Sequence, residues 1–142
     1  MSYKYNILLA EDDRADQEII RRSLNKADLN YDLHIVNNGE ELLKYIDGTE
    51  KGKNKEPDLI LLDLNMPKID GRQVLEKLKQ EKILNRVIII LTTSQNQNDI
   101  DFAYAKGVKS FITKPSTLNE FNKMINQLQK YWLESVILPT KK

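Results

Sequence analysis

The chain has 142 residues, 40% of them hydrophobic and 30% charged, which is long enough for one domain with a sizeable core. With 22 basic and 21 acidic residues the net charge is +1, and this gives no reason to expect a nucleic-acid partner or an anionic membrane surface. The lack of cysteine excludes disulfides and thiolate metal sites, and no apolar run is long enough to span a membrane, so we expect a cytoplasmic protein without membrane contact.

Five short apolar runs predict the strands of a sheet. They lie at residues 5–10, 31–36, 59–62, 87–91 and 109–113. The third and fourth runs are continuously apolar, which is typical of strands buried on both faces. The second run is half polar, which favours a position at the edge of the sheet.

Segments with helical spacing of apolar residues separate these runs. They lie at residues 14–27, 38–46, 71–81, 98–106 and 117–132. Two of them begin with a capping signature, Asn38 with Glu41 and Thr117 with Glu120. Strands that alternate with helices imply a parallel sheet covered on both faces, so the predicted fold is a single doubly wound α/β domain with five strands and five helices.

Polar residues follow the apolar strands at the point where each strand ends. Glu11 and Asp12 follow the first strand, Asp63 the third, Thr92 the fourth and Lys114 the last. Ligands of open α/β sheets bind outside the carboxyl ends of the strands. In the strand order 2-1-3-4-5, strands one and three are neighbours and strands four and five lie beside them, so we expect these side chains to meet in one site.

The predicted site combines negative and positive groups that suit a phosphoryl group. Three carboxylates in one pocket raise each other's pKa unless a cation lies between them, and oxygen ligands suit Mg²⁺. An ammonium and a hydroxyl opposite a metal-bound carboxylate can bind phosphoryl oxygens through charge and a hydrogen bond. Asp63 fits best beside both the metal and Lys114, so it is the candidate nucleophile that would form an acyl phosphate.

Four motifs, in this order, resemble the receiver domain of two-component response regulators over about residues 4–130. They are ILLAEDD at 7–13, DLILLDLNMP at 58–67 with DG at 70–71, LTTS at 91–94 and FITKP at 111–115. The resemblance implies a flavodoxin-like receiver fold and transfer of phosphate from a histidine kinase to Asp63. It also implies that Glu11, Asp12, Asp63 and the backbone carbonyl of Asn65 hold Mg²⁺.

The resemblance further implies a conformational switch. Thr92 and Lys114 would bind the phosphate, and Phe111 would be the switch aromatic that rotates. Phosphorylation adds about −1.5 to −2 charge, so Thr92 would move toward the phosphate and vacate space that Phe111 fills. This movement would reshape the face formed by the helix at 98–106, the strand at 109–113 and the last helix.

Two finer features also follow from the resemblance. Asn65 and Ser94 stand two residues after the phosphoacceptor and the switch hydroxyl, where the family tunes autodephosphorylation. From the residues alone, Ser94 could equally cap the following helix. The peptide bond between Lys114 and Pro115 is expected to be cis, which is affordable only before proline.

The C-terminal part of the chain points to a narrower group. Residues 131–139, the glycine- and lysine-rich loop before Pro57, and DGR at 70–72 are similar to small response regulators that pair with cyanobacterial and bacterial phytochromes. This implies a phytochrome-like sensor histidine kinase, an unnamed downstream effector, and a homodimer through the switch face and the Trp132 tail. We expect a receiver domain at 1–130 and an extension at 131–142 without an output domain. The apolar tail either folds back on its own domain or is buried in a partner.

Three other functions were weighed against the receiver hypothesis. An aspartyl-phosphate hydrolase of the haloacid-dehalogenase type needs an acid two residues after its nucleophile, where this chain has Asn65. A flavodoxin-like cofactor binder needs a phosphate-binding loop where residues 11–13 are acidic. A phosphorylation-independent interaction module with a receiver fold stays as the alternative. We therefore expect a signalling protein and not an enzyme, apart from self-catalysed phosphotransfer and autodephosphorylation.

Overall fold

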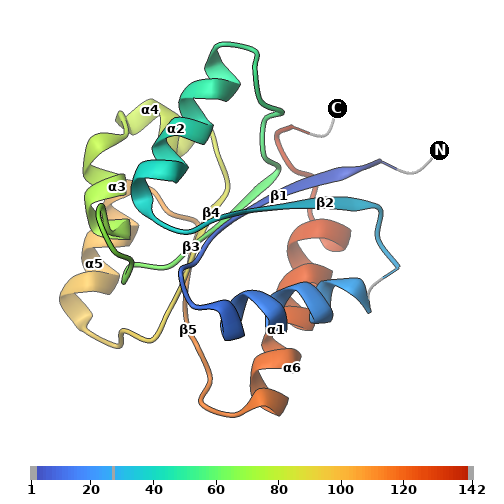
Figure 1. Ribbon diagram of the computed structural model, residues 1–142. Helices are drawn as coiled ribbons and strands as arrows, with labels where there is room; N and C mark the ends of the chain where they lie inside the picture. The colour runs from blue at the N-terminus through green and yellow to red at the C-terminus, as the bar shows by residue number, and fades with distance from the viewer. Residues whose placement is uncertain (1–2, 27, 141–142) are drawn as a thin grey trace.

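A five-stranded parallel sheet forms the centre of the computed structural model, which describes residues 3–26 and 28–140 (Figure 1). The strands are β1 (Tyr5–Ala10), β2 (Tyr31–Val36), β3 (Leu59–Leu62), β4 (Ile88–Thr92) and β5 (Ser110–Thr113). Their order is β2-β1-β3-β4-β5, so the predicted order 2-1-3-4-5 is confirmed. The continuously apolar β3 lies in the middle of the sheet and the half-polar β2 at one edge, as their sequences predicted.

Six α-helices form within the described residues, one more than predicted. They are α1 (Arg14–Asn25), α2 (Gly39–Glu50), α3 (Gly71–Lys77), α4 (Gln80–Leu84), α5 (Gln97–Lys106) and α6 (Leu118–Gln129). The predicted single helix at 71–81 was wrong, because Leu78 adopts an extended conformation with ψ 136° and ends α3. A separate helix, α4, then follows and buries Ile83 in the core. The predicted end of the first helix at residue 27 lies outside the described residues.

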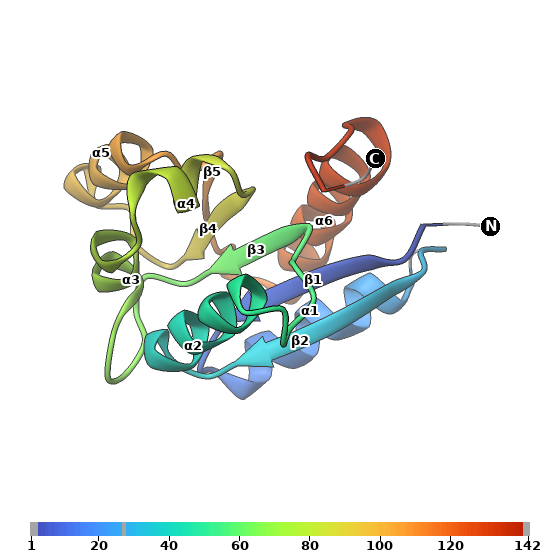
Figure 2. The same cartoon turned by 90° about the horizontal axis from the view of Figure 1, so that it is seen from above.

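Alternate residues of the central strands face two separate apolar cores. Leu8 and Ala10 of β1 pack in a core with residues of α2, α3, α4 and α5, whereas Ile7 and Leu9 pack in a core with residues of α1 and α6. The same alternation continues in β3 and β4, because successive side chains of a strand point to opposite faces. Figures 1 and 2 show the resulting three layers, with the sheet between the two groups of helices.

Polar side chains begin the helices where the sequence predicted caps. The Asn38 side chain accepts a hydrogen bond from the Glu41 backbone nitrogen at 2.9 Å, and Thr117 accepts one from the Glu120 backbone nitrogen at 3.2 Å. Each bond satisfies a backbone donor that has no partner inside the helix. The starts of α2 and α6 were therefore readable from local sequence.

The C-terminal tail folds back on the domain. After α6 the chain forms a π-helical segment, η1 (Lys130–Ser135), in which Leu133 is buried and accepts a hydrogen bond on its carbonyl from the Tyr5 hydroxyl at 2.6 Å. Leu138 is also buried, and the Thr140 hydroxyl donates to the Asp58 carboxylate. Of the two alternatives that the sequence left open, folding back therefore describes most of the tail. Both ends of the described chain lie on the same side of the molecule (Figure 1).

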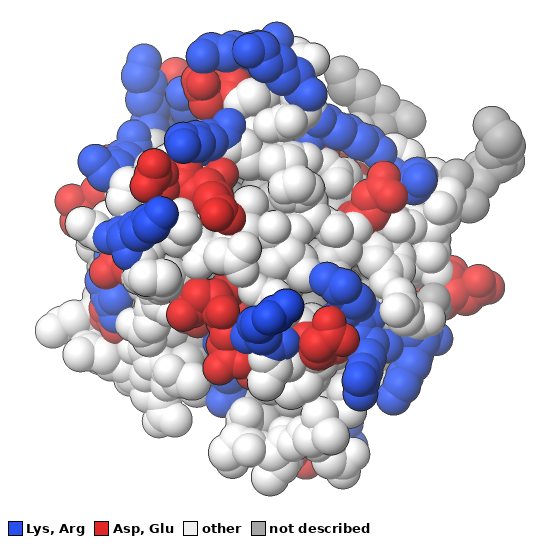
Figure 3. All heavy atoms as spheres, in the orientation of Figure 1, with Lys and Arg blue, Asp and Glu red and all other residues white. Residues whose placement is uncertain are grey.

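The molecular surface carries charges of both signs. Figure 3 shows lysine and arginine side chains interspersed with acidic ones over the face seen in Figure 1. Across residues 3–26 and 28–140, no helix combines the length and the apolar character that a membrane crossing requires.

Candidate functional site

The predicted polar residues converge at the carboxyl edge of the sheet. The Asp63 backbone nitrogen donates to the Ala10 carbonyl at 3.1 Å, and the Lys114 backbone nitrogen donates to the Thr92 carbonyl at 2.7 Å. The hydrogen-bonded ladder of the sheet thus extends into the site residues themselves. Glu11 follows β1 directly, with its nitrogen bonded to the carbonyl of the last residue of β2. The backbones of these residues are therefore held by the sheet.

Lys114 is the cation at the centre of the site. Its ammonium lies 2.6 Å from Glu11 Oε1, 2.8 Å from Asp16 Oδ2 and 3.1 Å from Asp63 Oδ2, and its side chain is only 5% exposed. Burial works against the charged ammonium, but hydrogen bonds to Asp16 and Glu11 outweigh it and raise the pKa of Lys114. Lys114 is therefore fully charged at neutral pH.

Asp16 is a site residue that the sequence reasoning missed. It lies in the first turn of α1, where the Asp13 side chain accepts a hydrogen bond from its backbone nitrogen at 3.0 Å. The helix that begins just after β1 starts at the carboxyl edge of the sheet, so its first turn reaches the site. An acid in the first turn of that helix was visible in the sequence and is the signal that could have found it.

Glu11 is almost completely buried beside Lys114. Its Oε2 accepts a hydrogen bond from the Asp13 backbone nitrogen at 3.1 Å. Burial raises the pKa of Glu11 to about 7, and the hydrogen bond and positive charge of Lys114 oppose this effect. A further cation in the pocket would stabilise the ionised carboxylate.

Three carboxylates form a candidate metal site. Ligand oxygens of Glu11, Asp12 and Asp63 all lie within 4.8 Å of one another. Their oxygen donors suit hard cations such as Mg²⁺ and Mn²⁺. The exposed Asp12 leaves one side open to water or a ligand. The Asn65 backbone nitrogen donates to Asp63 Oδ1 at 3.1 Å, whereas metal binding by the Asn65 carbonyl stays a prediction.

The hydroxyl of Thr92, the predicted switch residue, is fully buried and has two distant hydrogen-bond donors. Thr92 Oγ1 lies 3.4 Å from Asn65 Nδ2 and 3.5 Å from the Ser94 backbone nitrogen. Ser94 does not cap α5, because Asn96 does so by accepting a hydrogen bond from the Asn98 backbone nitrogen. The Ser94 hydroxyl instead donates to Asp99 Oδ2 at 2.7 Å.

An ion pair next to the site was not predicted at all. Arg72 Nε and Nη2 donate to the two carboxylate oxygens of Asp99 at 2.6 and 2.7 Å. The Arg72 guanidinium holds the pKa of the Asp99 carboxyl at about 2, so this carboxylate is ionised at neutral pH. Arg72 Nη1 also lies 3.5 Å from Asn65 Oδ1. Because Arg72 and Asp99 stand 27 residues apart, no local pattern could reveal the pair.

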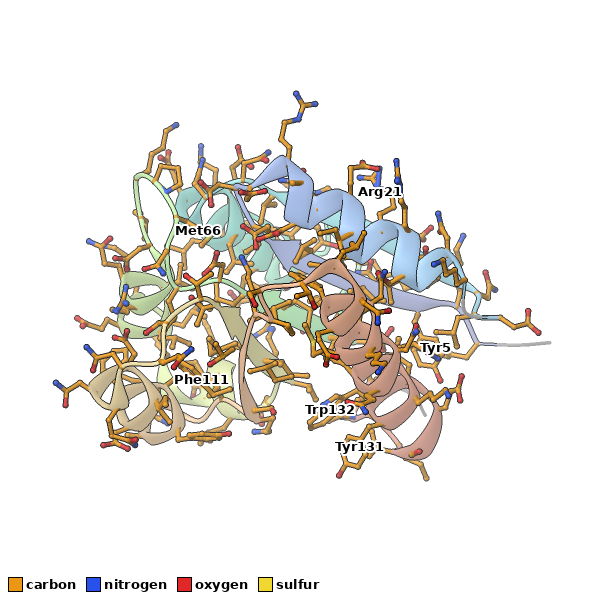
Figure 4. All side chains as sticks on the ribbon, turned by 90° about the horizontal axis from the view of Figure 1, so that it is seen from below. Tyr5, Arg21, Met66, Phe111, Tyr131 and Trp132 are labelled. Atoms are coloured by element: carbon orange, nitrogen blue, oxygen red, sulfur yellow. The ribbon has the colours of Figure 1, made fainter. Side chains whose placement is uncertain are left out.

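The predicted switch aromatic lies between the sheet and α5. Phe111 is half-buried against the core that contains α2, α3, α4 and α5, and Figure 4 shows it beside α5. Its backbone nitrogen donates to the hydroxyl of Tyr104 at 3.1 Å. This contact ties β5 to α5, and rotation of Phe111 stays a prediction.

The Lys114–Pro115 peptide bond is trans, in contrast to the predicted cis form. The described residues contain no cis peptide bond, so the prediction of a cis bond was wrong. The trans form is intrinsically favoured before proline by roughly 0.5–1 kcal/mol. With the bond in this form, the Lys114 ammonium already contacts three carboxylates.

The first residue of α3 lies very close to the backbone of Asp63. The Gly71 nitrogen donates to the Leu64 carbonyl at 3.0 Å, and a Cβ atom on Gly71 would lie 2.5 Å from the Asp63 carbonyl oxygen. Only glycine allows this approach without a shift of the backbone.

Comparison with known proteins places this site in a family. The response regulator receiver domain matches residues 7–126. The chain belongs to this family. It is 37% identical to the response regulator Rcp1 of Synechocystis over 135 residues, which cover 94% of this chain and 92% of the relative. The receiver assignment and the flavodoxin-like fold expected from the motifs are thereby confirmed.

Solved structures of phytochrome response regulators are similar to this chain over nearly their whole length. The phosphorylated cyanobacterial phytochrome response regulator RcpA superposes with a TM-score of 0.90 at 33% identity, over 97% of this receiver and 100% of RcpA. The Mn²⁺-bound form of Rcp1 superposes with a TM-score of 0.89 at 35% identity, over 96% and 99% of the two chains. The similarity to phytochrome-associated regulators expected from the tail is therefore confirmed.

Proposed function

We propose that this receiver accepts a phosphoryl group from a sensor histidine kinase on Asp63. The carrying observation is the position of the Lys114 ammonium, 3.1 Å from Asp63 Oδ2 and inside a cluster of carboxylates that fits a divalent metal. A charged lysine beside a buried carboxylate suits the binding of phosphoryl oxygens. The chain acts in this proposal as a phosphoacceptor in the cytoplasm and has no separate small-molecule substrate.

The transfer step uses the residues described above, a divalent metal ion and a phosphorylated kinase histidine. A carboxylate oxygen of Asp63 attacks the phosphorus, so an oxygen–phosphorus bond forms while the nitrogen–phosphorus bond breaks and its electron pair returns to the imidazole. Lys114 neutralises charge on the phosphoryl oxygens, and the Thr92 hydroxyl donates a hydrogen bond to one of them. Mg²⁺ held by Glu11, Asp12, Asp63 and the Asn65 carbonyl would supply further charge neutralisation at these oxygens.

The same residues would carry the signal to the surface. A phosphoryl group competes with Glu11 and Asp16 for the Lys114 ammonium and attracts the Thr92 hydroxyl. The contacts of Thr92 with Asn65 and Ser94 are long, so little hydrogen-bond energy opposes its movement. Phe111 then fills the vacated space, which changes the face formed by α5, β5 and α6.

We infer a phytochrome-like kinase as the phosphate donor, because relatives named as phytochrome response regulators match nearly the whole chain. The downstream effector would read the α5–β5–α6 face. A homodimer through this face and the Trp132 tail is supported by exposed apolar side chains near the tail. Tyr131 is 56% and Ile137 is 87% exposed, and Figure 4 shows Tyr131 and Trp132 together at the end of α6.

Phosphorylation by acetyl phosphate tests the central proposal. We expect Mg²⁺-dependent incorporation of one phosphoryl group in the wild type, seen as a retarded band on a phosphate-affinity gel, and none after Asp63→Asn or after chelation by EDTA. Asp12→Asn is expected to raise the Mg²⁺ concentration needed for labelling, because it removes one carboxylate of the metal cluster. Phosphorylation of Asp63→Asn, or no phosphorylation of the wild type, would refute the proposal and favour the phosphorylation-independent interaction module.

Sedimentation velocity tests the homodimer. We expect a dimer at tens of micromolar protein with or without beryllofluoride as a phosphate mimic, weakened by Ile137→Asp because this places a charge in the apolar contact. A monomer under both conditions would remove the dimer from the proposal.

A further inference from the structure

We propose that the Arg72–Asp99 ion pair is a clamp that holds together the two loops that carry Asn65 and Ser94 and thereby prolongs the lifetime of the phosphoryl group on Asp63. This inference rests on the proposed function of Asp63. Arg72 and Asp99 are positioning residues in it, because they act through their neighbours and not on the reacting atoms.

The clamp belongs to a closed ring of hydrogen bonds around the site. Arg72 Nη1 lies 3.5 Å from Asn65 Oδ1, and Asn65 Nδ2 lies 3.4 Å from Thr92 Oγ1. On the other side the Ser94 backbone nitrogen lies 3.5 Å from Thr92 Oγ1, and the Ser94 hydroxyl donates to Asp99 Oδ2 at 2.7 Å. The bidentate bond between Asp99 and Arg72 completes the ring.

The ring has a tight side and a loose side. The contacts of Arg72 with Asp99 and of Asp99 with Ser94 are between 2.6 and 2.7 Å. Both contacts of Thr92, and that of Arg72 with Asn65, are 3.4 Å or longer. Charge-assisted bidentate pairs are also roughly twice as strong as neutral hydrogen bonds. When Thr92 moves toward the phosphate, the ring therefore opens at Thr92, while the Arg72–Asp99 pair persists.

The clamp joins the two loops that border the phosphoacceptor. Arg72 lies in the first turn of α3, and Asp99 lies in the first turn of α5. Asn65 is in the loop that leads from β3 to α3, and Ser94 is in the loop that leads from β4 to α5. A pair that fixes both loops limits the access of water to an acyl phosphate on Asp63, which begins the loop from β3 to α3. Loss of the ion pair frees the side chains of Asn65 and Ser94 and admits the water that hydrolyses the acyl phosphate.

The test is the first-order loss of label from each phosphorylated protein after acetyl phosphate is removed and Mg²⁺ is kept. Arg72→Lys keeps the positive charge but loses the bidentate guanidinium, and Asp99→Asn keeps the size of the side chain but loses its negative charge. We expect either change to speed the loss at least about threefold, which corresponds to roughly 0.65 kcal/mol in the barrier. The double variant should be no faster than the quicker single variant, because both changes break one clamp.

A second arginine pair provides a matched control. Arg86 precedes β4 at the opposite end of the sheet, and its Nε lies 2.8 Å from Glu56 Oε1. Within this pair Arg86 Nη2 donates to Glu56 Oε2 at 3.3 Å, while Arg86 Nε makes no hydrogen bond to any described residue. Arg86→Lys therefore alters an arginine–carboxylate ion pair far from Asp63, and we expect an unchanged lifetime. If Arg72→Lys does not fold, Asp99→Asn alone carries the test, because it removes the charge of the same pair.

The possible outcomes separate the two proposals. Lifetimes in the clamp variants that are unchanged, longer, or shortened equally by Arg86→Lys would overturn the clamp and leave Asp63 as the phosphoacceptor. Additive rate changes in the double variant would also overturn it, because they mean that the two residues act separately. A wild type that takes no label would overturn the proposed function and the clamp together.

Discussion

Replacement of Gly71, the first residue of α3, by alanine should displace the backbone of Asp63. A Cβ atom at position 71 would lie 2.5 Å from the Asp63 carbonyl oxygen and 2.8 Å from the Leu64 Cα. Ordinary contact begins near 3.4 Å, so the two backbone segments must separate by up to about 0.9 Å. Neither neighbour is a flexible side-chain end that could move away cheaply. We therefore expect a loss of about 1–3 kcal/mol in the free energy of unfolding.

The same displacement should slow phosphorylation. A misplacement of about 1 Å at a reacting group can cost about 10²-fold in rate, so we expect Gly71→Ala to reduce the rate of labelling by acetyl phosphate by about 10- to 100-fold. Urea unfolding measures the stability loss, and a time course on a phosphate-affinity gel measures the labelling rate.

Gly52→Ala is the matched control for this experiment. Gly52 has φ +74° and lies in an exposed loop, with open space where a Cβ atom would be. The left-handed backbone costs an alanine about 1–2 kcal/mol, so this variant should lose similar stability but label at the wild-type rate. Wild-type labelling by Gly71→Ala, or equal slowing in both variants, would refute the reasoning that the close approach positions Asp63.

Three further predictions concern the central lysine, the tail and the clamp. Lys114→Gln should lower the free energy of unfolding by about 3–5 kcal/mol, because it leaves buried carboxylates without their cation. In urea titrations, Mg²⁺ at about 10 mM should restore more stability to this variant than to the wild type. Leu138→Ala should cost about 2–4 kcal/mol and Ile137→Ala less than about 0.5, and equal effects in urea would contradict the folded-back tail. The depressed pKa of Asp99, about 2 against an ordinary 3.8, contributes stability that is present above about pH 4 and is lost as the pH falls toward 2. Asp99→Asn should therefore be less stable than the wild type by about 1–2 kcal/mol at pH 6, and a gap that stayed constant down to pH 2 in acid-unfolding curves would contradict this.

The alternation of strands and helices could be predicted because it depends on local patterns. The strand order 2-1-3-4-5 came from flavodoxin-like folds, and with that order the convergence of the site followed. Continuous apolar runs such as residues 59–62 identify buried strands, and the polar residues that follow them must lie at the carboxyl edge of a parallel sheet. The positions of Glu11, Asp63 and Lys114 needed no knowledge of long-range contacts beyond that order. The prediction of one continuous helix at 71–81 was wrong, because the spacing of apolar residues does not reveal a single extended residue such as Leu78.

Contacts between segments distant in the sequence were beyond such patterns. Asp16 contacts Lys114 across 98 residues, and Arg72 meets Asp99 across 27. Asp16, Arg72 and Asp99 are each typical of an exposed helix surface when taken alone, and only the packing of the helices against the sheet brings them to their partners.

The sequence by itself determined the alternation of strands and helices, the receiver family and the group of residues at the strand ends. It could do so because hydrophobic period, capping and strand-end position are properties of neighbouring residues. Only the tertiary structure decided that the tail buries Leu133 and Leu138 on its own domain, and that Arg72 forms a bidentate ion pair with Asp99 next to the candidate site. Those features depend on which surfaces meet after the chain has folded, because burial and bidentate geometry are properties of pairs of segments.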